Sequence, residues 1–360
     1  MESISLIEFP TTRYQGSKRK ILPWIYSAIK DLEFETVLDA FGGSASVSYL
    51  FKKMNKSVTY NDKLNFNHII GQAIIENNRI KLNHQDLLNL LDIQTEEDNS
   101  SFIQNHFKDI YYLDEENRWL DNVVSNIVNM NHYQGKTLQF KKSLAFYALF
   151  QASLIKRPFN LFHRKNLNIR NADVVRGFGN KVTWDRSFEE YLVKFTSEAN
   201  KLVFNSGKKC HSMNQSAFDI DSYGYDLVYL DPPYFRKDGS NESSNYLNCY
   251  HFLEGLSRYP EWKELIDYES VTLRFKQTVD NSEFKIGNVG EIFEKLITKY
   301  KDSKIVLSYK QGGVPSIEFL ENLIRKVKGN VHTVSKHYIY ALNHQNGDAQ
   351  NNREVLIIGI

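Results

Sequence analysis

The apolar positions at the start of the chain follow the period of a helix and then that of two buried strands. Apolar residues from Ile21 to Ile29 recur on one face of a helix that is expected to begin near Ser17. The short apolar runs 36–39 and 58–62 are typical of buried strands, and a helical pattern over 47–51 separates them. This order predicts a strand–helix–strand unit whose two strands are parallel.

Strand patterns return only after a long helical interval. From about Ile74 to Asn200 the sequence has helical stretches and Asn-rich polar loops but few strand patterns. The runs 226–230 and 304–309 are continuously apolar, as in strands buried on both faces of a parallel sheet. Residues 336–341 are expected to pair with a last run, 355–358, as an antiparallel edge hairpin.

The chain is long enough for two domains. It has 360 residues, of which 41% are hydrophobic and 24% charged, so packed cores are expected. We predict an α/β fold with a Rossmann-like sheet, formed by residues 1–73 and 205–360. Residues 74–204 are predicted to form an inserted, mainly helical domain.

Composition excludes several classes of protein. The net charge is only +2, so any argument for nucleic-acid binding has to rest on a local segment. Cys210 and Cys249 are the only cysteines and are far apart, which excludes a disulfide scaffold and a cysteine zinc site. No basic leader and no membrane-length apolar run is present. We therefore expect a soluble cytoplasmic protein with no metal and no membrane partner.

A glycine turn follows the first predicted strand. Gly42 and Gly43 allow backbone to approach a ligand closely, and Asp62 ends the second strand where a carboxylate can accept both hydroxyls of a ribose. The turn lacks both the dinucleotide fingerprint and the Gly-Lys-Ser/Thr of a phosphate loop. A nucleoside without phosphates, such as S-adenosylmethionine, fits better. An ordinary turn with a surface aspartate is the equally weighted alternative.

A rigid corner follows the apolar run 226–230. Asp231, Pro232, Pro233 and Tyr234 lie at the carboxyl end of a predicted sheet strand, where open α/β folds bind ligands. Asp231 and the Pro232 carbonyl can accept the two hydrogens of an adenine amino group, and Tyr234 can stack on an extruded base. The sequence therefore predicts these four residues as catalytic. A stiff structural turn is the alternative.

Together these motifs resemble the adenine-specific DNA methyltransferases, in particular the alpha group of the DNA adenine methylase family, of restriction-modification type. The resemblance rests on residues 13–18, 38–44, 60–62 and 231–234, in that order and with a large insert before the last. It implies transfer of a methyl group from S-adenosyl-L-methionine to the N(6) amino group of adenine in duplex DNA.

The resemblance also implies roles for individual residues. Lys18 would contact the carboxylate of the cofactor, Asp62 its ribose, and Asp231 would face both the methyl group and the target amine. The predicted cofactor-binding residues are Tyr14, Lys18, Asp39, Phe41, Gly42, Gly43, Asp62, Ser216 and Asp231.

Two positions depart from the family pattern. Ala45 replaces the usual third glycine of the turn, which is a small change. Ser216 stands where the family often has an acidic residue near the cofactor adenine, and Asp219 could take over that role.

A basic segment within the insert is the candidate for reading DNA. Residues 156–170 hold five Lys or Arg and no acid, interleaved with aromatic and amide side chains, and Arg176 and Lys181 extend the segment. A solvated basic face is the alternative. The predicted contacts are Lys156, Arg157, His163, Arg164, Lys165, Asn166, Arg170 and Lys181.

Two further segments could serve the same site. The polar stretch 236–250 could close over an extruded adenine or be a surface loop, and 308–313 could line the cleft or touch the phosphate backbone. We expect double-stranded DNA as partner, with a possible cognate restriction endonuclease acting as a separate protein. An RNA or protein amide methyltransferase and a catalytically silent DNA-binding relative remain as alternatives. A fused nuclease is not expected, because no nuclease motif is evident.

Overall fold

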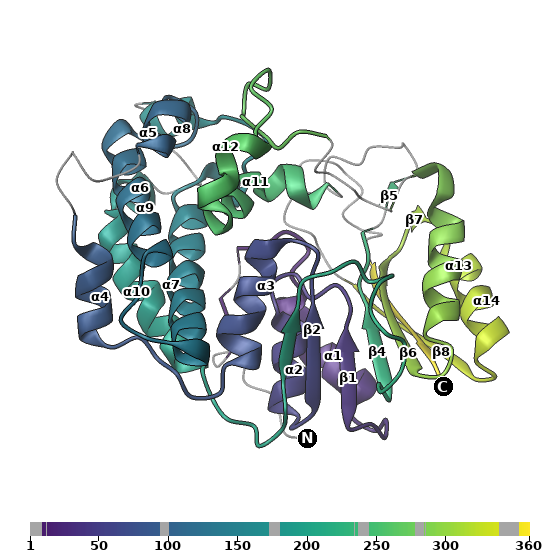
Figure 1. Cartoon of the computed structure of the whole chain (residues 1–360). Helices are drawn as coiled ribbons and strands as arrows, with labels where there is room; N and C mark the ends of the chain where they lie inside the picture. Colours follow the sequence, from purple (N-terminus) through teal and green to yellow (C-terminus); the bar gives the residue numbers. More distant parts are fainter. Residues whose placement is uncertain are drawn as a thin grey trace.

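The computed structural model describes residues 9–11, 13–93, 101–172, 181–233, 235–236, 245–277, 284, 286–337 and 353–360. Within these ranges the chain forms one large mixed sheet, helices on both of its faces, and a separate layer of helices beside it (Figure 1).

The large sheet has seven strands in the order β3-β2-β1-β4-β6-β9-β8. Strands β1, β2, β3, β4 and β6 are parallel, whereas β9 is antiparallel to both of its neighbours. A second sheet pairs β5 with β7. The strands are β1 (Thr36–Asp39), β2 (Ser57–Asn61), β3 (His211–Met213), β4 (Leu227–Leu230), β5 (Phe235–Arg236), β6 (Lys304–Lys310), β7 (Gly313–Val314), β8 (Val331–His337) and β9 (Arg353–Gly359).

Alternate residues of the central strands enter two different cores. Val37 of β1 and Val306 of β6 point to one face, and their neighbours Leu38 and Leu307 point to the other. The first face is covered by α1 (Leu22–Ile29) and α2 (Ser46–Lys53), which follow the short helix η2 (Lys18–Ile21). The second face is covered by α13 (Val289–Lys299) and α14 (Ile317–Val327), which follow η6 (Ile286–Asn288). Helices on both faces explain why these strands are apolar throughout.

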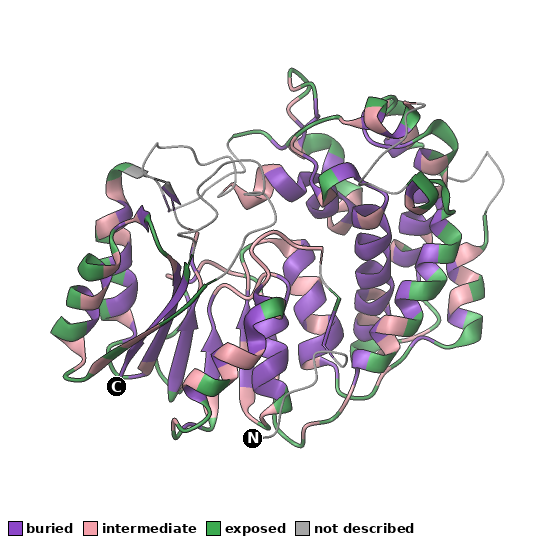
Figure 2. Ribbon diagram, turned by 180° about the vertical axis from the view of Figure 1, so that it is seen from behind, coloured by how far each residue is buried: buried purple, intermediate pink, exposed green. Residues whose placement is uncertain are grey.

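The helical layer is built around α7 (Gly135–Ile155). This helix is buried along most of its length from Phe140 onward (Figure 2), because α6, α10 and α3 pack on different sides of it. The other helices of this part are α3 (Asn65–Gly71), η3 (Gln72–Glu76), α4 (His84–Leu91), α5 (Phe102–His106), α6 (Asp114–Val128), η4 (Pro158–Asn160), α8 (Leu167–Asn171), α9 (Lys181–Asp185) and α10 (Phe188–Leu202).

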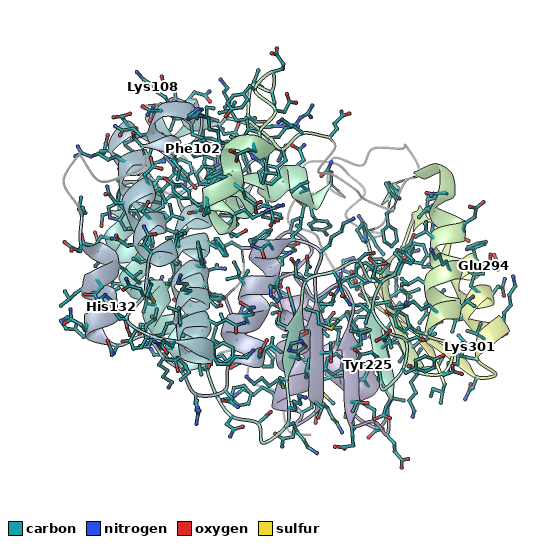
Figure 3. The ribbon with its side chains drawn as sticks, viewed as in Figure 1. Phe102, Lys108, His132, Tyr225, Glu294 and Lys301 are labelled. Atoms are coloured by element: carbon teal, nitrogen blue, oxygen red, sulfur yellow. The ribbon has the colours of Figure 1, made fainter. Side chains whose placement is uncertain are left out.

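A later part of the chain returns to this layer. Helix α11 (Tyr246–Ser257), η5 (Tyr259–Glu261) and α12 (Trp262–Leu265) lie against it, although they follow β4 in sequence. The ring of Trp262 is 4.9 Å from that of Phe107 and 5.4 Å from that of Phe102, which Figure 3 labels on this side of the molecule. Phe252 stacks on Phe162 at 5.0 Å. Aromatic packing therefore ties 246–265 to the helices of the insert.

Most predicted elements agree with the structure. The predicted strands 36–39, 58–62, 226–230, 304–309 and 355–358 correspond to β1, β2, β4, β6 and β9, and the α/β class is confirmed. Within the described residues the interval 74–200 contains no strand.

Two details of the sheet differ from the prediction. The antiparallel partner of β9 begins at Val331 rather than at residue 336, and residues 338–341 lie outside the described ranges. Strand β3 was not predicted, because a polar three-residue edge strand has no apolar run to reveal it.

Candidate active site

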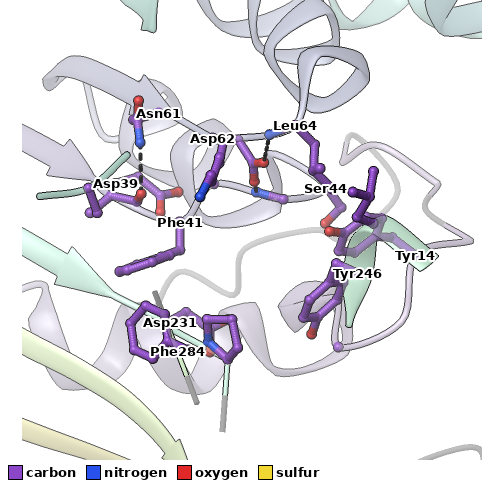
Figure 4. A pocket seen from close by; sticks show the side chains of 18 of the residues that line it. Tyr14, Asp39, Phe41, Ser44, Asn61, Asp62, Leu64, Asp231, Tyr246 and Phe284 are labelled. Atoms are coloured by element: carbon purple, nitrogen blue, oxygen red, sulfur yellow. Dashed lines mark hydrogen bonds between the residues drawn. The ribbon is translucent and has the colours of Figure 1, made fainter. Parts of the chain in front are cut away.

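A cavity of about 400 Å³ opens at the carboxyl ends of β1 and β4. The strand order reverses between these two strands, and such a switch point is where open α/β sheets bind ligands. The opening segment of the chain, the glycine turn, the end of β2, the acid–proline corner and the first turn of α11 line it (Figure 4). Its volume suits a nucleoside-sized ligand.

The glycine turn is shaped by close contact with aromatic rings. A Cβ atom on Gly42 would lie 2.1 Å from the ring of Tyr60, so no side chain fits there. Gly43 has a φ of +47° and donates its N–H to Oδ2 of Asp62 over 2.9 Å. Ala45 also adopts a left-handed φ, of 60°. Glycine adopts that conformation at no steric cost, so Ala45 is strained relative to a glycine at this position.

Asp62 is fixed at the rim of the cavity by backbone donors. It accepts the N–H groups of Gly43 and Leu64, each over 2.9 Å. Burial raises the pKa of its carboxyl group, and these two donors oppose the shift. Beside it, Asn61 donates to the carbonyls of Ala40 and Gln215, each over 3.0 Å, and so joins the turn after β1 to the segment after β3.

Asp39 offers an unsatisfied acceptor to the cavity. The Ser48 hydroxyl donates to its Oδ2 over 2.6 Å, whereas Oδ1 has no hydrogen-bond partner among the described residues. Burial raises the pKa of Asp39 to about 7 in spite of the Ser48 hydrogen bond. A buried carboxylate in this situation is stabilised by a ligand that brings a donor or a positive charge.

Three tyrosines with nearly parallel rings cluster at another wall of the cavity, which Tyr14 and Tyr246 line. The Tyr14 ring stacks on Tyr250 at 4.7 Å and on Tyr246 at 5.6 Å, with interplanar angles of 7° in both cases. The backbone N–H of Gln15 donates to the Tyr250 hydroxyl over 2.6 Å. The opening segment is therefore held against α11, and a flat aromatic surface borders the cavity.

The opposite wall is also aromatic and contains Ser216. Phe284 lies 5.8 Å from Phe41 and 6.1 Å from Phe218, measured between ring centroids. Ser216 lines the cavity beside Phe218, whereas the exposed Asp219 does not line it. Of the two residues considered for the cofactor adenine, Ser216 is thus the one in position. Its contact with a ligand stays a prediction.

Asp231 lines the cavity and forms an ion pair with the buried ammonium group of Lys18. Its Oδ1 lies 3.0 Å from Nζ of Lys18, and the same ammonium lies 3.1 Å from Oε1 of Glu354. The pKa of Asp231 is raised by burial and lowered by Lys18. Lys18, predicted to bind a cofactor carboxylate, lines the cavity but has these two protein carboxylates beside it.

The two prolines of the acid–proline corner differ in their surroundings. Pro232 is buried and Pro233 lines the cavity, while Tyr234 lies outside the described residues. Phe235 follows in β5 and pairs with Val314 of β7, which fixes the exit of the corner. Of the segment 308–313, Ser308 is buried and faces Glu354 rather than lining the cavity.

The basic segment separates into buried and exposed positions. Arg157 is buried, and its guanidinium donates to the carbonyls of Leu161, Arg164 and Lys165. It also lies 4.5 Å above the Tyr111 ring. These hydrogen bonds from one guanidinium group fix the backbone conformation of the loop 157–165.

Two other basic residues of the segment share an internal partner. Lys156 lies 2.7 Å and Arg170 2.8 Å from Oε1 of Glu116 on α6, and both side chains are buried. Lys156, Arg157 and Arg170 were predicted to contact DNA. The structure instead buries all three side chains inside the protein. Their charges are used inside the protein, because a buried cation has to be paired.

The remaining candidates are at or near the surface. Arg164, Lys165 and Lys181 are exposed, and His163 and Asn166 are half-buried. The loop adjoins α11, since the Phe162 N–H donates to the Cys249 carbonyl over 2.8 Å. The first turn of α11 in turn lines the cavity, so this loop and the cavity share a supporting helix. Arg176 lies outside the described residues.

Several residues at the cavity were not singled out from the sequence, although some belong to the stretch 236–250 that was expected either to close over the site or to be a surface loop. Asn245, Tyr246 and Leu247 line the cavity, and they belong to the polar stretch 236–250 whose residues 237–244 lie outside the described ranges. Glu254 accepts the N–H groups of Asn65 and Phe66 at the start of α3 and also lines the cavity. Burial raises its pKa to about 7. Only the packing of α11 on α3 brings these side chains here.

The fold and the cavity define a class of protein: an α/β protein with a nucleoside-sized cavity next to an acid–proline corner. Within the described ranges, no group of His, Cys, Asp and Glu side chains is arranged to hold a metal ion. Every helix described is too short or too polar to cross a lipid bilayer.

Comparison with known proteins identifies the family. The family model of D12 class N6 adenine-specific DNA methyltransferases matches residues 14–298, and the chain belongs to this family. It is an adenine-specific DNA methyltransferase (EC 2.1.1.72), as the sequence predicted. The family uses S-adenosyl-L-methionine as methyl donor and DNA as substrate.

Individual relatives agree with this assignment. Type II methyltransferase M2.HphI from Haemophilus parahaemolyticus is 28% identical over 343 residues, which cover 92% of this chain and 93% of that protein. Modification methylase StsI from Streptococcus sanguinis is 26% identical, and type II methyltransferase M.FokI from Planomicrobium okeanokoites is 25% identical. In both of these, 87% of the chain matches 46% of the relative, so the chain spans about half of their length.

The buried role of Arg157 predicts a stability effect. Arg157→Ala should lower the free energy of unfolding by about 3 kcal/mol, because several buried backbone carbonyls lose a charged donor. Urea denaturation followed by circular dichroism measures this. Arg164→Ala, an exposed neighbour in the same loop, should change stability by less than about 0.5 kcal/mol. Equal effects of the two substitutions would contradict the assigned role.

Proposed function

We propose that this methyltransferase carries out site-specific transfer of the methyl group of S-adenosyl-L-methionine to the exocyclic N(6) amino group of adenine in duplex DNA, as the modification enzyme of a restriction-modification system. One observation carries the proposal: a single cavity is lined both by the glycine turn with Asp62 and by the corner with Asp231, which the whole helical insert separates in sequence.

The cavity has the features that the methyl donor requires. Asp62 is held by two backbone donors and still borders the cavity, as expected of a residue that receives ribose hydroxyls. Oδ1 of Asp39 lacks a partner among the described residues, so it is suited to the ammonium group of the donor's amino-acid end. Phe41 and Phe284 supply an apolar wall, and Ser216 lies beside it. When bound, the donor supplies an electrophilic methyl carbon on a sulfonium centre.

The acid–proline corner is proposed to orient the acceptor. The adenine amino group is a weak nucleophile because its lone pair is delocalised into the ring. Asp231 and the Pro232 carbonyl would accept its two hydrogens, which favours a tetrahedral nitrogen with its lone pair directed at the methyl carbon. Pro233 keeps this corner rigid at the cavity wall. Tyr234 keeps its predicted role as a surface on which the extruded base stacks.

We propose that exposed residues of the loop 157–166 contact DNA. Arg164 and Lys165 lie on a loop whose carbonyls Arg157 binds from inside, and His163 and Asn166 of the same loop are half-buried. This arrangement suits positional contacts to phosphates and base edges, because the charged groups are presented by a rigid support. Lys181 is a further candidate. A DNA duplex bound there would have its target base near the rim of the cavity.

The domain division is also a proposal. Residues 1–73 and 205–360 would form the catalytic domain, and 74–204 the target-recognition domain. Because α11 and α12 pack on the helices of the insert, we propose that 246–265 contributes to the same recognition layer.

The biological setting follows the relatives. The proteins to which the chain is similar are named type II methyltransferases and a modification methylase, which supports a host-protecting role alongside a cognate endonuclease that acts as a separate protein. We propose the cytoplasm as the compartment. The family match makes an RNA or protein amide substrate the weaker alternative.

The donor site predicts a pH dependence of binding. Affinity for S-adenosyl-L-methionine should rise as the pH increases through about 7, because Asp39 with its raised pKa must ionise to attract the ammonium group of the donor. Isothermal titration calorimetry between about pH 5.5 and about 7.5 measures this, a range in which most of the donor's α-amino group is protonated. Asp39→Asn should flatten the dependence. The proposal fails if the two pH profiles run parallel.

The corner predicts a separation of catalysis from DNA binding. Asp231→Ala should reduce methyl transfer to a duplex oligonucleotide by at least about a hundredfold, because the amine loses its acceptor, while DNA affinity stays within a few fold. Radiolabelled methyl transfer and gel-shift titrations give the two values. Asp219→Ala, an exposed acid outside the cavity, is the matched control and should retain turnover. Near-normal turnover of Asp231→Ala would refute the assigned role.

The loop predicts the salt dependence of DNA binding. Arg164→Ala should weaken binding several fold and reduce the slope of log affinity against log salt concentration by about 1, as expected for one lost phosphate contact. Fluorescence anisotropy at several salt concentrations measures it. Arg325→Ala, an exposed arginine on α14 at the other face of the sheet, should leave the slope unchanged. An unchanged slope for Arg164→Ala would remove this loop from the interface.

A further inference from the structure

A buried carboxylate near the end of the chain faces the catalytic corner. Glu354 lies in β9 and is fully buried. Its Oε1 accepts a hydrogen bond from the Ser308 hydroxyl over 2.9 Å and lies 3.1 Å from Nζ of Lys18. The same Nζ lies 3.0 Å from Oδ1 of Asp231. Glu354 and Asp231 therefore share one ammonium group.

The alternation of the strands explains why these side chains meet. Asp231 continues the series Leu227 and Tyr229, and Glu354 continues the series Leu356 and Ile358, all of which point to the same face of the sheet. Lys18 begins η2 on that face. Because β6 lies between β4 and β9, Lys18 spans the distance that separates the two acids.

Burial makes this arrangement sensitive to charge. The exposed fraction is 5% for Lys18, 19% for Asp231 and 0% for Glu354, so water screens their mutual interactions weakly. An ammonium between two carboxylates divides its attraction between them. The charge that Asp231 can present to a ligand thus depends on Glu354.

We propose that Glu354 is a positioning residue for methyl transfer: it holds Lys18 from the side opposite Asp231 and, by sharing that cation, keeps Asp231 a strong hydrogen-bond acceptor for the adenine amine. This inference rests on the proposed role of Asp231. A carboxylate whose only neighbour was a full positive charge would accept a weaker hydrogen bond from a neutral amine.

The charged and titratable groups around Asp231 set the direction of the effect. Lys18 lowers the pKa of Asp231, whereas Glu354 raises it. Among the described residues, Asp39 at the end of the neighbouring β1 and the hydroxyl of Tyr229 on β4 also interact electrostatically with Asp231. Neutralising Glu354 therefore lowers the pKa of Asp231, and neutralising Lys18 raises it.

The test compares Glu354→Gln and Lys18→Met by two readouts. The first is the titration of Asp231 in the cofactor-free protein, followed by the carbon NMR signals of labelled aspartate carboxyls and assigned by the signal missing in Asp231→Asn. The second is the pH profile of single-turnover methyl transfer at saturating donor and duplex. Glu354→Gln should move the Asp231 midpoint and the acid limb to lower pH, and Lys18→Met should move both to higher pH.

The effect on rate should also be specific. Above the acid limb, Glu354→Gln should lower the rate constant on the order of tenfold, with KM for both substrates within about twofold, because ground-state binding does not use Glu354. Glu321→Gln, a carboxylate on α14 that accepts a hydrogen bond from Thr333, is the control and should shift nothing. Glu354→Asp keeps the charge at a greater distance and should shift the midpoint in the same direction by a smaller amount.

The outcomes separate the two proposals. An unchanged or raised Asp231 midpoint in Glu354→Gln overturns the positioning role, as does a loss of stability without any shift. If Glu354→Gln does not fold, the direction of the shift in Glu354→Asp decides. Full activity of Asp231→Asn would instead refute the proposed role of Asp231. The titration of Asp231 in Glu354→Gln and Lys18→Met would still report how strongly the three charges are coupled.

Discussion

A single buried ammonium group holds the catalytic centre together. Lys18 comes from the opening segment of the chain, Asp231 from the end of β4 and Glu354 from β9, so one cation joins three distant parts of the sequence. Each carboxylate would be costly to bury without a positive partner, and Lys18 would be costly to bury without them. The position of the acid–proline corner relative to the cavity depends on this mutual requirement. A methyltransferase gains from it an acceptor whose orientation is fixed before the base arrives.

Helix α11 links the helical layer to the catalytic cavity. Tyr250 of this helix accepts the N–H of Gln15 and stacks on Tyr14, and Glu254 accepts two N–H groups at the start of α3, directly after Asp62. The same helix packs on the insert through Phe252. Its contacts therefore run from the region proposed to read DNA to the region proposed to hold the donor. A rigid connection of this kind suits an enzyme that must align an extruded base with its cofactor.

The basic segment illustrates how a charge pattern can serve two purposes. Arg157 donates to three carbonyls of its own loop, and Lys156 and Arg170 pair with Glu116, so three of the five cations stabilise the fold. Arg164 and Lys165 remain exposed. Removal of the buried cations would disturb the shape of the loop, whereas removal of the exposed ones would act on the surface alone. The internal cations thus give the external ones a fixed geometry.

The sequence by itself determined the apolar strands β1, β2, β4, β6 and β9, the glycine turn with Asp62, the corner at Asp231 and the family, because each depends on local periodicity or on a short contiguous motif. It could not determine the pairing of Lys18 with Asp231 and Glu354, since that requires the order of β4, β6 and β9 in the sheet. Nor could the sequence show that Arg157 is buried. An arginine that donates to backbone carbonyls and one that binds a phosphate cannot be distinguished by their positions in a basic segment. Only tertiary packing decides which polar groups lose their water and must find partners inside the protein.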